Sequence, residues 1–388
     1  MKDFLYIAAG KLHLKLDGAP FRLISSEFAQ ATQERILQIQ RRNIFRERGI
    51  MANRVPPQML KQMEEQANTP TPVNFTSVCC DRDGKIYYAL NVGDVAGIFT
   101  LDSDRIKEKR LYHGSDFLIR HLDLHDAEQL IACTTEQKDG TANIATMPID
   151  GARPHEITEG DSIDIAPAWI PHKKKALVYQ SAGIARNREG YVCDRSPFRI
   201  EELDFASQEI TCLAEDEGYD FLEPKMTADT LYYIRRPYNP RREETSIWSI
   251  IKDVLLLPWR LLDTFYQILN FFAMTFTGKP LMKAGVAKPT EAEQKMQVWG
   301  ELIDLHKLSQ NKNRQEGKSP GLVPDSWQLI AQKTDGTIQI IATGVLYYDL
   351  AADGSILYAN GNTIYYLKDF GASPEQLLDH KLVEQIAV

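Results

Sequence analysis

The chain has 388 residues, of which 43% are hydrophobic, 9% aromatic and 25% charged. This composition is typical of globular proteins and excludes a disordered, collagen-like or disulfide-scaffold chain. Asp and Glu (53) outnumber Lys and Arg (45), and the net charge of −8 argues against a general nucleic-acid coat protein, so we expect no nucleic-acid partner. The five cysteines show no paired spacing and the first residues form no long apolar run, so we expect a chain without a signal peptide in the reducing cytoplasm.

Strand-like segments recur along the chain in groups of four, separated by tight polar turns. The chain opens with three such strands, Phe4–Ala8, Lys11–Leu16 and Phe21–Ile24. The first complete group is predicted at Phe75–Cys80, Lys85–Leu90, Gly97–Leu101 and Lys109–His113. The second is predicted at Leu118–Leu124, Gln129–Thr134, Thr141–Ile149 and His155–Thr158. The third is predicted at Ile163–Ile170, Ala176–Gln180, Phe198–Asp204 and Glu209–Ala214. The fourth is predicted at Leu222–Met226, Leu231–Arg235, Trp327–Gln332 and Thr337–Ala342. The fifth is predicted at Leu346–Leu350, Ser355–Ala359, Thr363–Leu367 and Gln376–Asp379.

A last strand, Leu382–Val388, would join the three N-terminal strands as a sixth group, which removes the unpaired edge of an open repeat array. Two stretches, 26–73 and 238–325, do not fit the repeat, and without them each of six groups has about 42 residues, as expected for a propeller blade of about 40–45 residues. The sequence therefore predicts an all-β, six-bladed β-propeller, with seven blades as the alternative. The expected segments are propeller strands at 1–25, a helical insertion and linker at 26–73, blades at 74–237, a helical insertion at 238–325, and blades with ring closure at 326–388.

The third group contains the segment Ala166-Pro167-Ala168-Trp169-Ile170-Pro171-His172, followed by the apolar strand Ala176–Tyr179. This segment resembles the Pro-x-Trp-Ser-Pro-Asp-Gly repeat of TolB-like, WD40-like propellers, with Ile170 in place of Ser and His172 in place of Asp. The resemblance implies a propeller fold over the roughly 250 residues outside the insertions. TolB-like propellers include periplasmic partner-binding proteins and non-catalytic domains of serine peptidases, so the resemblance leaves the function open.

Both insertions are expected on one face of the propeller, together with a long loop at Ser181–Pro197, because connections in a four-stranded meander alternate between two faces. Three elaborations on one face indicate a functional face. The first insertion is predicted to form an amphipathic helix that begins at Ser26-Glu27 and ends at Gly49. Its polar side carries arginines that include Arg41 and Arg42. That side is either a solvated surface or a basic face for an acidic partner or anionic lipid.

The second insertion is apolar and aromatic from Ile247 to Phe276, but charged residues and Pro258 interrupt it, so it is not expected to span a membrane. It is predicted to form two amphipathic helices. A capping-box pattern at Thr290-x-x-Glu293 predicts another helix, with Met296, Trp299, Leu302, Ile303 and His306 on one side.

The apolar stripes of this insertion have three interpretations. They are buried in a small helical subdomain, dock a protein partner, or bind a membrane surface through 247–276. The candidate partner-binding residues are Trp248, Leu255, Trp259, Leu262, Phe265, Leu269 and Phe272, with Arg41 and Arg42 of the first insertion.

The sequence contains no Gly-x-Ser-x-Gly elbow, no Walker-type phosphate loop and no dinucleotide fingerprint, and no cofactor is expected. The one candidate metal set is His121, Asp123 and His125, which would share one face of an inner strand by alternation. The simpler interpretation is a polar channel wall of hydrogen-bonded histidines. We therefore predict a non-enzymatic scaffold that binds a protein partner through its helical insertions. The alternatives are a peripheral membrane-surface adaptor and a metal-dependent hydrolase or lactonase that uses the channel.

Overall fold

The computed structural model describes residues 3–51, 70–102, 107–239, 295–298, 301–304 and 321–388. The chain divides into two compact units. The first contains Met1–Ala29, Pro72–Pro240 and Gln294–Val388, and the second contains Gln30–Thr71 and Arg241–Glu293. The described part of the second unit is mostly helical, and in it the Gln33 amide donates a hydrogen bond of 2.5 Å to the carbonyl of Thr71.

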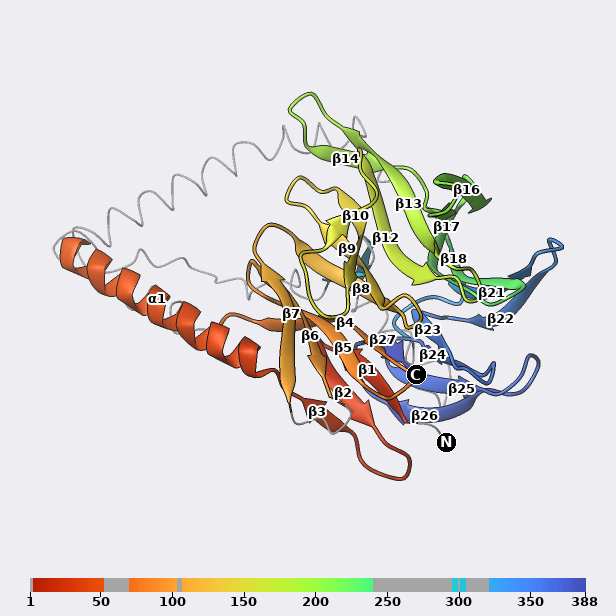
Figure 1. The fold of residues 1–388 in the computed structure, drawn as a ribbon, viewed down its shortest axis with the longest axis horizontal. Helices are drawn as coiled ribbons and strands as arrows, with labels where there is room; N and C mark the ends of the chain where they lie inside the picture. Colours follow the sequence, from red (N-terminus) through yellow and green to blue (C-terminus); the bar gives the residue numbers. More distant parts are fainter. Residues whose placement is uncertain (1–2, 52–69, 103–106, 240–294, 299–300, 305–320) are drawn as a thin grey trace, which may run out of the picture. The chain divides into compact units, whose positions relative to one another are not determined.

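The first unit is built from antiparallel sheets of four strands, as the sequence predicts (Figure 1). The terminal sheet has the order β27 (Val383–Ala387), β1 (Phe4–Ala8), β2 (Lys11–Lys15), β3 (Arg22–Ile24). The next has the order β4 (Val73–Cys80), β5 (Ile86–Val92), β6 (Val95–Leu101), β7 (Glu108–Gly114). A further sheet contains β17 (Tyr219–Met226), β18 (Thr230–Pro237), β21 (Gln328–Lys333) and β22 (Ile338–Thr343). Another contains β23 (Tyr347–Leu350), β24 (Ile356–Ala359), β25 (Thr363–Leu367) and β26 (Glu375–Asp379).

The largest sheet has nine strands and consists of two such meanders joined by a parallel contact between Ala142 and Ile163. The first meander is β8 (Leu118–His125), β9 (Leu130–Glu136), β10 (Ala142–Pro148) and β11 (His155–Glu156). The second is β12 (Ser162–Trp169), β13 (Ala176–Arg186), β15 (Arg199–Asp204) and β16 (Glu209–Ala214), with β14 (Val192–Arg195) paired to the end of β13.

The two ends of the chain meet in one sheet. Strand β27 pairs antiparallel with β1, with Tyr6 opposite Ile386, and the Ala9 amide donates a hydrogen bond of 3.0 Å to the Leu382 carbonyl. The expected pairing between the last strand and the N-terminal strands is therefore confirmed.

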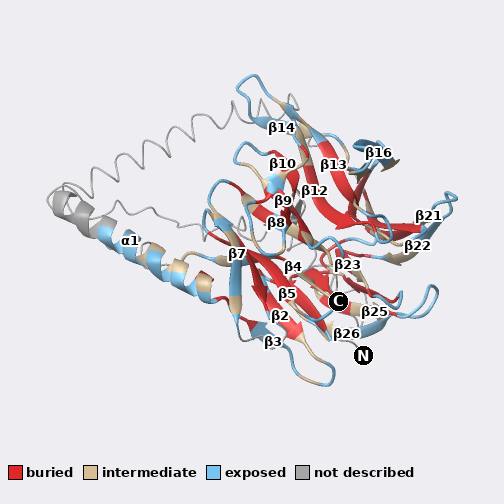
Figure 2. Cartoon of the chain, viewed as in Figure 1, coloured by how far each residue is buried: buried red, intermediate tan, exposed pale blue. Residues whose placement is uncertain are grey.

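Burial follows strand position (Figure 2). The second strands of the meanders, such as β5, β9 and β24, are almost fully buried. The first strand of each meander, called its inner strand here, is only partly buried in β4 and β8. The outer strands β3, β7, β16, β22 and β26 are mainly exposed or half-buried. Apolar clusters pack most of the four-stranded meanders on a neighbour; for example, Tyr87 of β5 and Ile131 of β9 share one cluster. Polar turns with glycine link the strands, and Gly84 and Gly354 take positive φ angles of 78° and 84° that other residues adopt at a cost.

Helix α1 (Glu27–Met51) begins directly after Ser26, as the sequence predicts. The Ser26 hydroxyl accepts a hydrogen bond of 3.1 Å from the Ala29 amide, which is a typical N-cap contact. Glu108 accepts bonds from the Ser26 hydroxyl (2.5 Å) and the Phe28 amide (3.0 Å). The predicted end at Gly49 is wrong, because the helix continues to Met51, and a glycine weakens a helix without stopping it.

The prediction of a helix after Thr290 is wrong over the part that the structure describes. Residues Lys295–Val298 (β19) and Glu301–Asp304 (β20) pair as an antiparallel hairpin. In this pairing Met296 stands opposite Ile303, so residues whose spacing fits one helix face are partners across two strands instead.

Candidate functional site

Three inner strands share a β-bulge at one position. The pairing register shifts between Arg120 and Asp123 in β8, and at the corresponding points of β12 and β17. Each bulge holds a residue other than glycine at positive φ: His121 (50°), Ala166 (56°) and Glu223 (52°). A bulge adds a residue to one strand and redirects its side chain, so these positions no longer follow the alternation of a regular strand.

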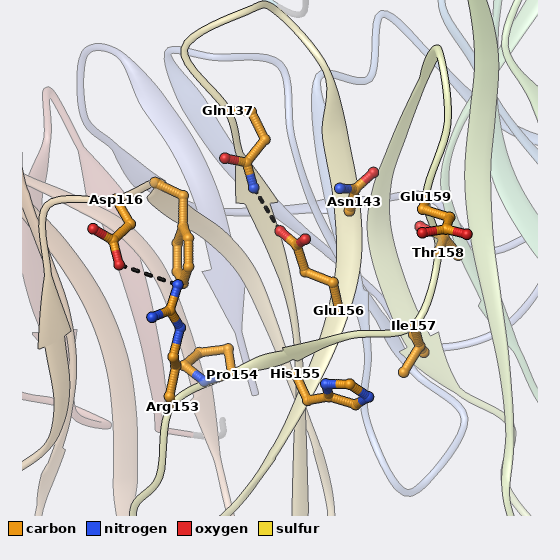
Figure 3. Close-up of a pocket in the computed structure, with 11 residues that line it drawn as sticks. Asp116, Gln137, Asn143, Arg153, Pro154, His155, Glu156, Ile157, Thr158 and Glu159 are labelled. Carbon is orange, nitrogen blue, oxygen red and sulfur yellow. Dashed lines mark hydrogen bonds and ion pairs between the residues drawn. The ribbon is translucent and has the colours of Figure 1, made fainter.

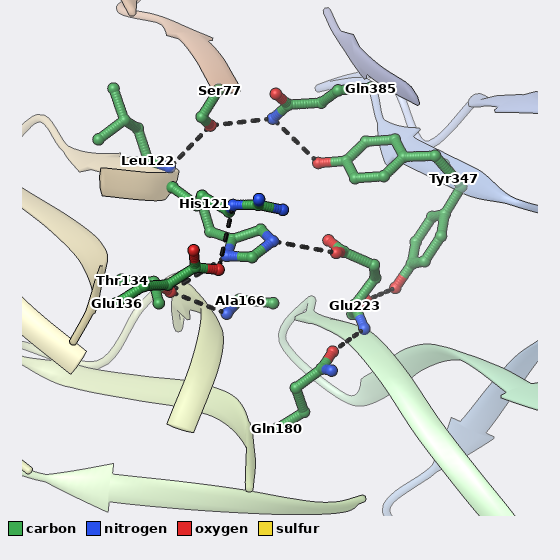
Figure 4. A network of polar contacts seen from close by, with 12 residues as sticks. Ser77, His121, Leu122, Thr134, Glu136, Ala166, Gln180, Glu223, Tyr347 and Gln385 are labelled. Carbon is green, nitrogen blue, oxygen red and sulfur yellow. Dashed lines mark hydrogen bonds and ion pairs between the residues drawn. The ribbon is translucent and has the colours of Figure 1, made fainter. Parts of the chain in front are cut away.

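Polar side chains of neighbouring meanders hold the bulges (Figure 4). The Ala166 amide donates a hydrogen bond of 3.3 Å to Thr134 Oγ1 of β9. The Glu223 amide donates one of 2.7 Å to the Gln180 side chain of β13. Thr134 Oγ1 is also 3.1 Å from His121 Nδ1. The bulges are therefore fixed by inter-strand contacts that arise from the fold.

Two aspartates link strands of neighbouring meanders: Asp123 of β8 bonds to β12, and Asp349 of β23 bonds to the residue after β27. Asp123 Oδ2 accepts a hydrogen bond of 2.6 Å from the Trp169 amide, and Asp349 Oδ2 accepts one of 2.9 Å from the Val388 amide. Lys225 of β17 forms an ion pair with Asp349 Oδ1 through its Nζ atom. Burial raises the pKa of Asp123 to about 6, although Lys225 and the Trp169 amide partly oppose this effect.

Glu223 is the least satisfied acid of this cluster. Its side chain is 5% exposed, and Oε1 makes no hydrogen bond with the described residues. The nearest cationic candidate is His121 Nε2 at 3.9 Å. Burial raises the pKa of Glu223 to about 7, whereas burial together with Arg120 lowers the pKa of His121 to about 3. At neutral pH the imidazole is therefore uncharged and gives Glu223 no ion pair.

Two cavities meet at this cluster and share His121, Tyr347 and Gln385 in their walls. One of about 220 Å³ contains the charged groups Asp123, Glu223, Lys225 and Asp349. The other, of about 450 Å³, contains Arg120 and Glu384. Gln385 lies between them and hydrogen-bonds to Ser77 and to the Tyr347 hydroxyl, both at 3.2 Å. The shared wall is thus held by a polar network (Figure 4).

The predicted metal set is not assembled. His121 lies at the bulge near Thr134 and Glu223, whereas the His125 ring stands edge-on to Trp169 with centroids 5.0 Å apart, and His125 Nδ1 accepts from the Glu128 amide. The bulge breaks the alternation on which the metal hypothesis for His121, Asp123 and His125 depended. Among the described residues, no three His, Cys, Asp or Glu side chains are arranged to hold a metal ion.

A second polar cluster lies at the root of the long insertion. Asp220 is buried in β17 and accepts two hydrogen bonds of 2.8 Å from Arg195 and one of 2.9 Å from Arg236 Nε. The Arg236 guanidinium lies 4.8 Å from the centre of the Trp327 ring. Although burial opposes ionisation, the two arginines hold the pKa of Asp220 below its usual value. Asp220 thus connects β18, the strand that precedes the insertion, with β14, and Arg236 extends this contact to Trp327 after the insertion.

The stretch expected to be a loop at Ser181–Pro197 is instead a hairpin. Strand β13 continues to Arg186 and returns as β14, with Ile184 opposite Arg195. Arg186 pairs with Asp139 (3.2 Å) and Asp161 (2.8 Å), which fixes the hairpin on its neighbours. Tyr191 near its tip is 72% exposed.

The candidate partner-binding residues between Trp248 and Phe272 lie outside the described residues. Arg41 and Arg42 are exposed on α1, as expected for the polar side of that helix. No helix within the described ranges is long and apolar enough to cross a membrane.

A wide surface hollow of about 690 Å³ lies beside the short outer strand β11 (Figure 3). Three of its charged groups have partners: Arg153 pairs with Asp116 at 3.1 Å, and Glu156 accepts from Gln137 (2.5 Å) and Thr135 (2.7 Å). These contacts fix the edge of the sheet and leave little unused chemistry, so the inner-strand cavities and the root of the insertion are the stronger candidates.

Glu223, Lys225, Asp349 and Asp220 were not singled out from the sequence. One signal could have found the first two: Glu223-Pro224-Lys225 has the X-Pro-X pattern of Ala166-Pro167-Ala168. Two charged residues replacing two alanines in an apolar inner strand are unusual, because buried charges need partners.

No protein-family model and no curated protein sequence matches the chain. In structure, the chain is similar to TolB from Acinetobacter baumannii, with 11% sequence identity, 99% of this chain covered and a TM-score of 0.51. The chain spans 65% of the length of that TolB chain. It is also similar to a solved nidogen/laminin complex chain, with 8% identity, 99% and 97% of the two chains covered and a TM-score of 0.50. These similarities establish that the chain has a TolB-like β-propeller fold.

Proposed function

We propose that the chain is a six-bladed propeller that acts as a non-enzymatic scaffold and binds a protein partner through the insertion at 238–325. The observation that carries this proposal is the contact set around Asp220. It joins Arg236, two residues before the insertion, to Arg195, and Arg236 stacks on Trp327, two residues after it. Both ends of the insertion thus start from one buried, charge-paired point, which is how a rigid scaffold presents a variable segment.

The blade count is supported by the succession of contacts between meanders. Apolar clusters link β5 with β9, β10 with β13, β13 with β18, β21 with β24, and β24 with β27. The remaining neighbours, β1 and β4, are bridged by a hydrogen bond of 2.8 Å from the Phe75 amide to the Gly10 carbonyl.

The proposal is tested by comparing the intact chain with a chain in which 240–320 is replaced by a short Gly/Ser linker. Proteins that co-purify with each are identified, and the strongest specific candidate is purified for direct binding. The proposal predicts that this candidate binds the intact chain and is lost from the shortened chain, with the propeller still folded. Equal binding to both chains would contradict the proposal. Binding of the intact chain to anionic vesicles without any protein partner would replace it with the membrane-surface adaptor.

A further inference from the structure

The smaller inner-strand cavity, of about 220 Å³, has more acids than bases in its wall. Lys225 and Asp349 neutralise each other in a half-buried ion pair. The remaining titratable groups in the wall are His121, Asp123, Glu223 and Tyr347. The imidazole is uncharged at neutral pH because of its burial. Two carboxyl groups, of Asp123 and Glu223, are therefore left without a cation of their own.

Glu223 points to a missing partner more directly than the count of acids. Glu223 lies in the cavity wall, and its Oε1 atom is buried and makes no hydrogen bond with the described residues. Buried polar atoms in native proteins nearly always have a partner, which is a protein group, a water or a ligand. The 3.9 Å to His121 Nε2 is too long for a hydrogen bond.

The fold does not require a carboxylate at this position. Ala166 occupies the same bulge in β12, with the same positive φ and the same following proline, and it supplies no side-chain chemistry. The amides of both residues are satisfied in the same way, by a polar side chain of the preceding meander. The backbone therefore does not need a carboxylate at Glu223, and the described residues around it leave Oε1 without a hydrogen bond. Such a buried acid is better explained by ligand binding than by a contribution to the stability of the fold.

We propose that this cavity binds a short primary alkylammonium ion, whose ammonium group donates hydrogen bonds to the carboxylates of Glu223 and Asp123. The alkyl chain would lie against the apolar part of the wall, Leu122, Ala168, Met226 and Leu350. Tyr347 adds an aromatic face close to the site, and Lys225 Nζ already lies 5.9 Å from its centre. The cavity volume corresponds to roughly seven waters at about 30 Å³ each, which suits a chain of about four carbons.

A metal ion fits this wall less well than an organic cation. Among the described residues, no three His, Cys, Asp or Glu side chains converge as metal ligands, and the Lys225 ammonium stands beside Asp349. An ammonium ion needs only a few acceptors at hydrogen-bond distance and tolerates an apolar wall on its other side. The two kinds of cation are distinguished by the experiment.

Binding should depend on the ionisation of Glu223, because the carboxylate attracts an ammonium ion far more strongly than the neutral acid does. The pKa of Glu223 is about 7. The affinity for an alkylammonium ion should therefore level off above pH 7. Below it, affinity should fall by up to about tenfold per pH unit as the acid is protonated.

The experiment is titration calorimetry of the full chain with n-butylammonium chloride at pH 8 and low salt. Butan-1-ol is the neutral ligand of the same shape, and calcium chloride is the metal probe. We expect saturable one-to-one binding of n-butylammonium and none of butan-1-ol. Glu223→Gln and Glu223→Ala should each weaken binding at least tenfold. The alanine variant reproduces the bulge of Ala166 and should fold, as checked by near-ultraviolet circular dichroism.

Glu384→Gln is the matched control, because Glu384 is an acid in the wall of the other cavity. This variant should bind n-butylammonium like the unchanged chain. Unchanged binding by Glu223→Gln would overturn the proposal, and so would the absence of saturable binding up to about 10 mM ligand, well above a Kd of 1 mM. Saturable calcium binding that depends on Glu223, with no binding of n-butylammonium, would equally overturn it.

Discussion

Asp220 and Arg236, each with a side chain no more than 2% exposed, are joined by a hydrogen-bonded ion pair of 2.9 Å at the root of the long insertion. Arg236 is the largest fully buried side chain among the described residues. Burying such a charge is unfavourable unless it is paired and hydrogen-bonded. The position of β18, the strand that precedes the insertion, therefore depends on the Asp220 carboxylate.

We predict that Asp220→Asn lowers the free energy of unfolding by about 3–5 kcal/mol, because it leaves the Arg236 guanidinium buried without a counter-charge. Urea unfolding at pH 7 measures the change. Asp216→Asn is the matched control, since Asp216 is exposed and only accepts from the nearby Gly218 amide. A loss below about 1 kcal/mol for Asp220→Asn would mean that the cluster does not stabilise the root.

Deletion of 382–388 should abolish cooperative unfolding or cause aggregation. Strand β27 covers the edge of β1, and Gln385 connects it to Ser77 and Tyr347. Without it, an unpaired strand edge becomes available to other chains. Thermal unfolding with light scattering measures both effects. A milder test is Gln385→Ala, which leaves the buried Val78 amide without its acceptor and should cost about 1–3 kcal/mol. Unchanged thermal unfolding of the truncated chain would contradict the role assigned to β27.

Acid should destabilise the fold through His13. The His13 ring is buried, stacks on Tyr6, and contacts the His380 ring at 4.8 Å, and neither His13 nitrogen has a hydrogen-bond partner among the described residues. Burial, together with His380 and Lys11, lowers the pKa of His13 to about 4.

The unfolded chain therefore binds the proton of His13 first, and stability falls as the pH drops from about 6.5 to about 4, by up to about 3 kcal/mol from this group. His13→Phe keeps a ring in place and should flatten this part of the curve of unfolding free energy against pH. His155→Gln, which replaces an exposed histidine, should leave this part of the curve unchanged. An unchanged slope in His13→Phe would show that His13 is not the group responsible.

Glu223 should have the opposite pH dependence. Its pKa is raised by burial to about 7, so the folded state holds the proton longer than the unfolded state does. Its contribution to stability is therefore lost as the pH rises from about 4.5 through 7. Glu223→Gln cannot ionise, and its stability relative to the unchanged chain should increase over this range, as measured by urea unfolding at several pH values. A constant difference between the two proteins would place Glu223 in a more polar environment than its burial indicates.

Strand positions could be predicted because alternation, tyrosine-rich middle strands and Asp-Gly turns are local signals. Phe4–Ala8, Glu209–Ala214 and Thr363–Leu367 match their predicted bounds. The bulges at His121 and Glu223 could not be predicted, because a strand with one extra residue has the same composition as a regular strand. The Asp220 cluster joins residues far apart in the chain, so only the folded structure brings Arg195 and Arg236 to one carboxylate.

The central claim is that the insertion binds the partner through the apolar stripe after Pro258, and it is tested most directly by the Kd of the purified partner. We predict that Trp259→Ser with Phe265→Ser raises this Kd at least a hundredfold and leaves the melting temperature of the propeller unchanged. Gln267→Ala, on the opposite side of the predicted helix, should leave the Kd unchanged. A double variant that binds with an unchanged Kd, or that loses stability while it keeps its partner, would contradict the claim.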